Sequence, residues 1–157
     1  KTLAPGLRVG WAVPGRYRDQ VAHRKYVSSM ATATLPQLAI AEYLAHGGYE
    51  RHLRRVRATY AQQAQRMVEA IARNFPAGTR VTRPSGGFVL WVELPEKVDA
   101  LVLHRQALER GVSVAPGPLF SATGKYRNFL RLTCALPWDD RLDRALVTLG
   151  GLAEALA

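Results

Sequence analysis

Residues 49–75 read YERHLRRVRATYAQQAQRMVEAIARNF, and this stretch carries the strongest periodic pattern in the chain. Apolar side chains recur in it at steps of three and four residues, the spacing that places them on one face of an α-helix: Leu53, Val56, Tyr60, Ala64, Met67, Ile71 and Phe75. The Pro76-Ala77-Gly78 sequence that follows predicts the end of the helix. At ~1.5 Å of rise per residue, such a helix extends ~40 Å, which is long enough to connect two domains.

The sequence after this helix predicts a small α/β layer with a core of its own. Short apolar runs bounded by turn residues predict four strands, at residues 79–83, 87–94, 111–115 and 129–134. A helix is expected over residues 98–110, and Asp139 or Asp140 can cap a final helix whose leucines share one face. We therefore expect a mixed sheet covered by two helices.

The sequence before the long helix predicts parts of a larger structure. Alternating apolar residues from Leu7 to Val13 predict a loop that leads into a strand, and helices are expected over residues 16–29 and 35–45. One strand has too few partners to make a sheet. We therefore expect residues 1–47 to be the C-terminal remnant of a larger domain whose main sheet lies upstream, residues 48–75 to be an interdomain helix, and residues 76–157 to be a small C-terminal domain.

The composition predicts a folded and strongly basic protein. The chain has 157 residues, of which 48% are hydrophobic, enough for one core. Its formal net charge of +10 makes nucleic acid or a phosphorylated ligand a candidate partner. Arginines gather at the start of the long helix, at Arg51, Arg54, Arg55 and Arg57. No aromatic residues alternate with them to stack bases, which favours a solvated face over a nucleic-acid groove.

Cysteine usage and hydropathy predict a cytoplasmic protein. The single cysteine, Cys134, excludes an internal disulfide and fits a reducing compartment. No apolar run approaches the length of a membrane span, and no leader for export is recognisable. We expect neither a membrane partner nor a metal site.

Arg131 lies within the apolar run of residues 129–134. An arginine is costly to bury unless an anion meets it, and a carboxylate would do so through two parallel hydrogen bonds. The alternative is that Arg131 points to solvent from an edge strand, because strand alternation permits that position as well.

Four segments together resemble a known family: KTLAPGLRVGW (residues 1–11), PSGGFVLWVELP (84–95), GVSVAPGPLFS (111–121) and RNFLRLTCALPW (127–138). They resemble the C-terminal part of a fold-type I, pyridoxal-phosphate-dependent aminotransferase (class I/II) domain. The sequence from SATGKYRN onward is most similar to the kind of domain fused to GntR-family regulators of the MocR type. The resemblance covers essentially the whole chain and implies an α/β fold with pyridoxal 5'-phosphate as the cofactor.

The resemblance also implies roles for three residues. Lys1 would bind the cofactor as an aldimine and would act as the catalytic base, and Arg8 would bind the cofactor phosphate. Arg131 would bind the α-carboxylate of the substrate, with Phe120 nearby. On composition alone, Lys1 and Arg8 are ordinary solvated charges, and that interpretation is the alternative.

For function, the resemblance implies an aminotransferase-like domain of a transcriptional regulator. This domain would form an aldimine with pyridoxal phosphate and an amino-acid or amine effector. The complete protein would be a homodimer and would bind DNA through an N-terminal winged-helix domain outside this chain. The first alternative is a free-standing class I/II aminotransferase that moves an amino group between an amino acid and a 2-oxo acid. In that case the chain alone is expected to be inactive, because it lacks the residues that stack on the cofactor ring. A basic nucleic-acid-binding module is the second alternative.

Overall fold

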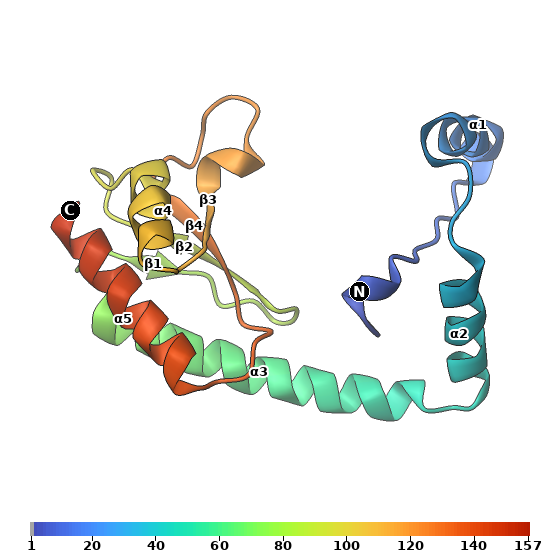
Figure 1. Ribbon diagram of the computed structural model, residues 1–157, viewed down its shortest axis with the longest axis horizontal. Helices are drawn as coiled ribbons and strands as arrows, with labels where there is room; N and C mark the ends of the chain where they lie inside the picture. The colour runs from blue at the N-terminus through green and yellow to red at the C-terminus, as the bar shows by residue number, and fades with distance from the viewer. Residues whose placement is uncertain (1) are drawn as a thin grey trace. The chain divides into compact units, whose positions relative to one another are not determined.

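The computed structural model describes residues 2–157 and has two compact units, which divide between Val56 and Arg57. The division falls inside a long helix, so this helix contributes residues to both units. Figure 1 labels the helices and strands in chain order. The division into residues 1–47, 48–75 and 76–157 stays a prediction.

The described residues of the first unit form helices and loops. Two short 3-10 helices, η1 (Pro5–Leu7) and η2 (Gly15–Tyr17), precede α1 (Arg18–Ser29) and α2 (Thr34–Ala45). Both α-helices lie close to where the sequence predicts them. The strand expected from the alternation between Leu7 and Val13 does not form, because none of the described residues pairs with this stretch as a neighbouring strand.

The first unit has no buried core within its described residues. No described residue before Arg57 is buried, and Trp11, Val13 and Leu35 keep most of their surface exposed. Apolar burial is the main favourable term in folding, so this segment is poorly stabilised by its own contacts. The sequence predicted this outcome.

Helix α3 (Tyr49–Asn74) matches the predicted helix to within one residue. Its C-terminal half belongs to the second unit, where Met67, Ala70 and Ile71 are buried. Pro76 follows the last turn and ends the helix, because its ring removes a hydrogen-bond donor and clashes with the preceding turn.

The second unit contains a sheet with the strand order β1-β2-β4-β3, formed by β1 (Arg80–Val81), β2 (Val89–Glu93), β3 (Ala115–Pro116) and β4 (Phe129–Thr133). Every pairing in the described residues is antiparallel, so the prediction of a mixed sheet is wrong. The chain passes through α4 between β2 and β3, and these two strands run in the same direction. However, β4 inserts between these two strands and runs opposite to both, so no parallel strands become neighbours.

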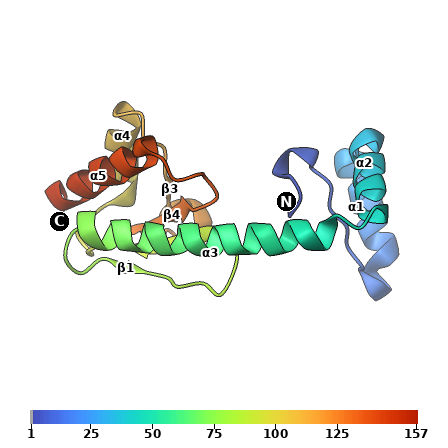
Figure 2. The ribbon, with the colours of Figure 1, turned by 90° about the horizontal axis from the view of Figure 1, so that it is seen from below.

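Helices cover one face of this sheet. The C-terminal half of α3, α4 (Ala100–Glu109) and α5 (Asp140–Ala155) share a core with the inward side chains of β2 and β4. Figures 1 and 2 show α5 beside the C-terminal half of α3. The sequence predicted two covering helices, and α3 supplies a third. The other face of β2 and β4 is open, and we refer to it as the open face.

Two aspartates begin the helices of this unit. The Asp99 carboxylate accepts hydrogen bonds from the backbone N–H groups of Leu101 and Val102 at the start of α4. The Asp139 carboxylate accepts one from the N–H of Leu142 at the start of α5, as the sequence predicted. Each cap satisfies backbone donors that have no partner inside the helix.

Cys134 lies in the core just after β4, and burial raises the pKa of its thiol. A thiol in such surroundings stays protonated and unreactive. Within residues 2–157, no helix combines the length and the apolar composition needed to cross a membrane.

Candidate functional site

Arg131 lies on β4, an interior strand of the sheet. Its neighbours Leu130 and Leu132 are buried on the helix-covered side, so Arg131 points to the open face, where its side chain is exposed. The register places Trp91 of β2 and Ala115 of β3 directly across from it. Arg131 therefore does face solvent, but from the middle of the sheet and not from an edge.

An aromatic cluster surrounds Arg131 on the open face. The ring of Phe120 lies under the guanidinium, with its centroid 4.6 Å from Cζ. Phe120 meets Trp91 nearly edge-on at 5.6 Å between centroids. Trp91 in turn packs against Phe129, with the rings stacked at 5.4 Å, and against Tyr126, edge-on at 5.4 Å. These separations are typical of favourable aromatic pairs.

The short 3-10 helix η3 (Gly117–Phe120) places the Phe120 ring. It follows β3 directly and packs so tightly that a Cβ on Gly117 would lie 2.8 Å from the Cβ atoms of both Phe129 and Tyr126. Tyr126 itself has a φ of 63°, in the left-handed region that is unfavourable for a residue with a side chain. The surrounding packing maintains this conformation, as is common at functional sites.

Two acidic groups of the second unit are already paired with other arginines. The guanidinium of Arg80 donates to the carboxylate of Glu93, and this hydrogen bond lowers the pKa of Glu93. Partial burial raises the pKa of Asp99, but hydrogen bonds from backbone N–H groups and from Arg127 outweigh it, so the pKa lies below its ordinary value. Within the described residues, the side chain of Arg131 makes no hydrogen bond or ion pair. Its donors are free for a carboxylate.

Arg131 also lines a cavity of about 700 Å³ in the second unit. The rest of the lining comes from Met67 of α3, residues 111–115, the end of β4, the segment that follows it and the first half of α5. It is mainly apolar, with Ser113, Thr133, Asp139 and Arg141 as polar groups. Cavities that bind small molecules have this size and this mixture of apolar walls with a few polar groups.

Arg8 lies in the first unit, immediately after η1. It has a φ of 53°, and its side chain is exposed and has no hydrogen-bond or ion-pair partner among residues 2–157. A strained conformation and a free planar guanidinium suit the binding of an anion such as a phosphate. Arg8 and Arg131 belong to different units, so their convergence on one ligand stays a prediction.

Lys1 lies outside the described residues, but the backbone of its neighbour Thr2 contacts a side chain of α3. The backbone carbonyl of Thr2 lies 3.0 Å from Nε2 of His52, whose ring also meets Tyr43 edge-on. His52 is not among the site residues that the sequence predicted. Its only signal there was a histidine within an arginine-rich turn, which usually indicates a solvated side chain.

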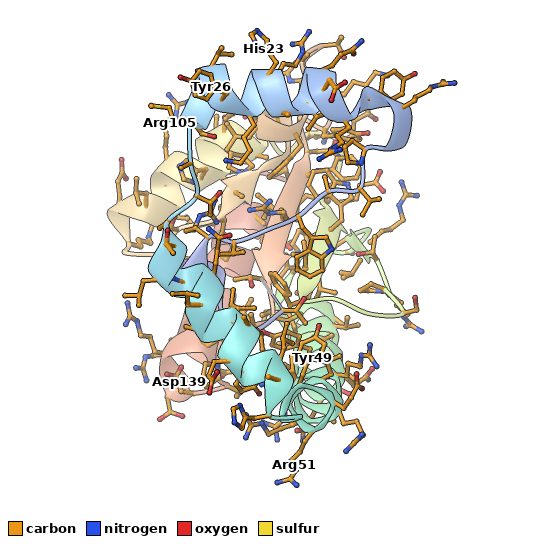
Figure 3. The ribbon with its side chains drawn as sticks, turned by 90° about the vertical axis from the view of Figure 1, so that its right-hand side faces the viewer. His23, Tyr26, Tyr49, Arg51, Arg105 and Asp139 are labelled. Carbon is orange, nitrogen blue, oxygen red and sulfur yellow. The ribbon has the colours of Figure 1, made fainter. Side chains whose placement is uncertain are left out.

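The arginine cluster of α3 is exposed as the sequence suggested. Arg51, Arg54, Arg55 and Arg57 all lie on the surface, and Figure 3 shows Arg51 pointing away from the helix. None of them forms an ion pair in the part of the chain that the structure describes. These observations fit a solvated face.

The comparison with protein families gives one match over nearly the whole chain. The model described as aminotransferase class I and II matches residues 2–149. This chain belongs to that family. The matched region contains Arg8, Phe120 and Arg131, so the family assignment covers both units.

Two kinds of curated relative are found within the family. An HTH-type transcriptional regulator of Escherichia coli K12, YjiR, is 45% identical over 150 residues, which are 96% of this chain and 32% of that protein. A 2-aminoadipate transaminase of Thermus thermophilus is 41% identical over 136 residues, which are 86% of this chain and 34% of that protein. The chain thus spans about a third of the length of these relatives.

A solved structure shows the same fold. The α-aminoadipate aminotransferase LysN of Thermus thermophilus, complexed with N-(5'-phosphopyridoxyl)-L-leucine, superposes with a TM-score of 0.85 at 37% identity, covering 97% of this chain and 39% of LysN. The α/β fold is therefore that of the C-terminal part of a fold-type I aminotransferase, as predicted.

Proposed function

We propose that this chain is part of the pyridoxal-phosphate-binding, aminotransferase-like domain of a MocR-type transcriptional regulator of the GntR family, with an amino acid or amine as its effector. The observation that carries the ligand assignment is the unpaired guanidinium of Arg131 above the Phe120 ring. The regulator assignment is supported by YjiR and by a second HTH-type regulator of Escherichia coli, YdcR, which is 36% identical over 98% of this chain. In the complete protein, DNA would bind through a separate N-terminal domain, and the protein would act in the cytoplasm as a homodimer.

The described residues fit an anionic cofactor. Arg8 offers a free guanidinium in a strained backbone conformation, and its planar donors match two oxygens of a phosphate. When bound, pyridoxal phosphate supplies an aldehyde that bonds amines covalently and a ring that withdraws electrons from them. Lys1 is the amine that family resemblance assigns to this bond, and its Nζ would take the α-proton of a bound amino acid.

Arg131 would hold the α-carboxylate of the amino acid. A carboxylate in front of its guanidinium accepts two parallel hydrogen bonds, which fix the orientation of the amino group as well as its distance. The carboxylates of Glu93 and Asp99 are already paired with Arg80 and Arg127. Helix α3 would connect the small domain with the cofactor-binding domain.

Arg131 can be tested in the full-length protein loaded with pyridoxal phosphate. Binding of L-leucine is followed by calorimetry for wild type, Arg131→Ala and Arg105→Ala. Arg105 lies exposed on α4 and makes no ion pair in the described residues, so its replacement is a matched control for the change in charge. Arg131→Ala should weaken binding about 10- to 100-fold, because hydrogen bonds to charged groups contribute ~1.5–3 kcal/mol. Equal affinities in all three proteins would contradict the proposal.

A free-standing aminotransferase is the second candidate, because the Thermus transaminase is 41% identical to this chain. The two candidates differ in turnover and in DNA binding. Repeated turnover of amino donors by the full-length protein, without binding of its promoter DNA in a mobility-shift assay, favours the enzyme. Specific DNA binding that responds to L-leucine, with little turnover, favours the regulator.

A further inference from the structure

We infer that Phe120 is a positioning residue that holds the Arg131 guanidinium for carboxylate binding, and that Trp91 holds Phe120 in turn. The inference rests on the proposed function, in which Arg131 binds a carboxylate. It concerns a contact that spans two segments of the second unit, η3 and β4.

The geometry of the contact leaves the binding edge of the guanidinium free. Cζ of Arg131 lies over the Phe120 ring, 4.6 Å from its centroid, and the ring carries no oxygen or nitrogen atom that could accept a hydrogen bond from the guanidinium. The N–H donors point outward in the plane of the guanidinium, away from its faces. A ring contact therefore restrains the side chain without using any donor that a carboxylate needs.

No hydrogen bond or ion pair restrains the Arg131 side chain among the described residues. The side chain is also exposed. A long side chain that is free in solution must lose rotamer freedom when it binds a ligand, and this loss weakens binding. Contact with Phe120 reduces that loss before the ligand arrives.

Phe120 is itself fixed from two sides. Trp91, which lies directly across from Arg131 in the sheet, contacts the Phe120 ring at 5.6 Å with an interplanar angle of 81°. The close packing of Gly117 against Phe129 and Tyr126 fixes η3, the element that carries Phe120. The ring, although 42% exposed, is thus held by contact with Trp91 and by the close packing of η3.

A positioning role predicts a loss of carboxylate selectivity, which a purely structural role does not. The test compares L-leucine with 3-methylbutylamine, which has the same side chain and amino group but no carboxylate. In the full-length, cofactor-loaded protein, the ratio of the two Kd values measures what the carboxylate contributes. Phe120→Leu keeps the apolar bulk and removes the ring, so it should lower this ratio about 3- to 30-fold, as expected for a cation–π contact of ~0.7–2 kcal/mol.

Matched variants define the expected outcome. Phe120→Tyr retains a ring and should retain the ratio. Leu119→Ala alters the adjacent exposed residue of the same 3-10 helix and should also leave the ratio unchanged. Arg131→Lys should lower the ratio at least as much as Phe120→Leu, because an ammonium group cannot form the bidentate pair.

Each contrary result identifies which claim fails. Phe120 is not a positioning residue if Phe120→Leu keeps the wild-type ratio of the two Kd values, or weakens the binding of both compounds equally, while Arg131→Lys lowers the ratio. In that case the role of Arg131 stands. If wild type shows no preference for L-leucine over the amine, or Arg131→Lys leaves the ratio unchanged, the carboxylate-binding role proposed for Arg131 fails and the inference fails with it.

Discussion

Alanine in place of Gly150 is expected to destabilise the second unit, whereas alanine in place of the neighbouring Gly151 is expected to stabilise it. Both glycines lie inside α5, so both replacements gain ~1 kcal/mol of helix propensity. Their surroundings differ. Gly150 is buried, whereas Gly151 is exposed and has no atom within 4 Å of an added Cβ. The pair therefore separates the cost of the contact from the gain in propensity.

The size of the effect follows from the contact between α5 and α3. A Cβ on Gly150 would lie 2.7 Å from the backbone carbonyl carbon of Asn74 and nearer still to its oxygen. Ordinary contact begins near 3.4 Å, so the two helices must separate by about 0.7 Å or more. Because the obstacle is backbone, no side-chain rotation relieves it, and the cost is expected in the upper part, ~2–3 kcal/mol, of the range for overpacking. We expect a net loss of ~1–2 kcal/mol for Gly150→Ala and a gain of ~0.5–1 kcal/mol for Gly151→Ala.

Urea denaturation followed by the fluorescence of Trp91 and Trp138 measures both changes. With a slope of ~2 kcal/mol per molar urea, the two variants should differ by ~1 M in the midpoint of unfolding. Equal midpoints, or a Gly150→Ala protein more stable than wild type, would refute the close contact between α3 and α5 and the packing argument drawn from it.

Further predictions concern a helix cap, a tight turn and the start of the chain. The pKa of Asp99 is lowered in the folded state, so its charge stabilises the fold above the ordinary carboxyl pKa, and this contribution is lost as the pH falls through the folded value. Urea titrations at about pH 7 and about pH 3 should therefore show that acid lowers the free energy of unfolding less for Asp99→Asn than for wild type. Asp99→Ala should also lower the free energy of unfolding by ~1 kcal/mol near neutral pH, because α4 loses its cap. Gly117→Ala should lower the stability by ~1–3 kcal/mol through overpacking against Tyr126, and an unchanged urea midpoint would contradict that packing. In the full-length protein, His52→Ala should weaken pyridoxal phosphate binding about 2- to 10-fold, because Thr2, the neighbour of Lys1, loses its contact with His52. Equilibrium dialysis measures this affinity and should show a smaller effect for His52→Gln. Equal affinity in wild type and His52→Ala would exclude a role of His52 in cofactor binding.

Local patterns in the sequence were sufficient to predict the helices. The apolar positions from Leu53 to Phe75 predict the extent of α3 to within one residue, because helical periodicity persists over the whole stretch. The cap at Asp139 was also predictable, since an aspartate before an apolar helical pattern satisfies free backbone donors whatever the rest of the fold does.

Long-range pairing was not predictable in the same way. The turns and apolar runs located β2 and β4, but nothing local to either strand shows that β4 inserts between β2 and β3. The mixed sheet was therefore a wrong prediction. For the same reason, the sequence indicated Arg131 and Phe120 separately but could not predict their contact. That contact depends on the pairing of Ala115 with Arg131 and on the tight turn at Gly117.

The register of β4 links the core to the candidate site. Leu130 and Leu132 are buried and Arg131 is not, because successive side chains of a strand point to opposite faces. A slip of one residue would expose both leucines and place the guanidinium in the core, where a charge without a partner costs several kcal/mol. The apolar burial that stabilises this sheet therefore also fixes Arg131 on the open face. We infer that conservative changes at Leu130, which does not line the cavity, act on ligand binding through stability alone, as long as the register is kept.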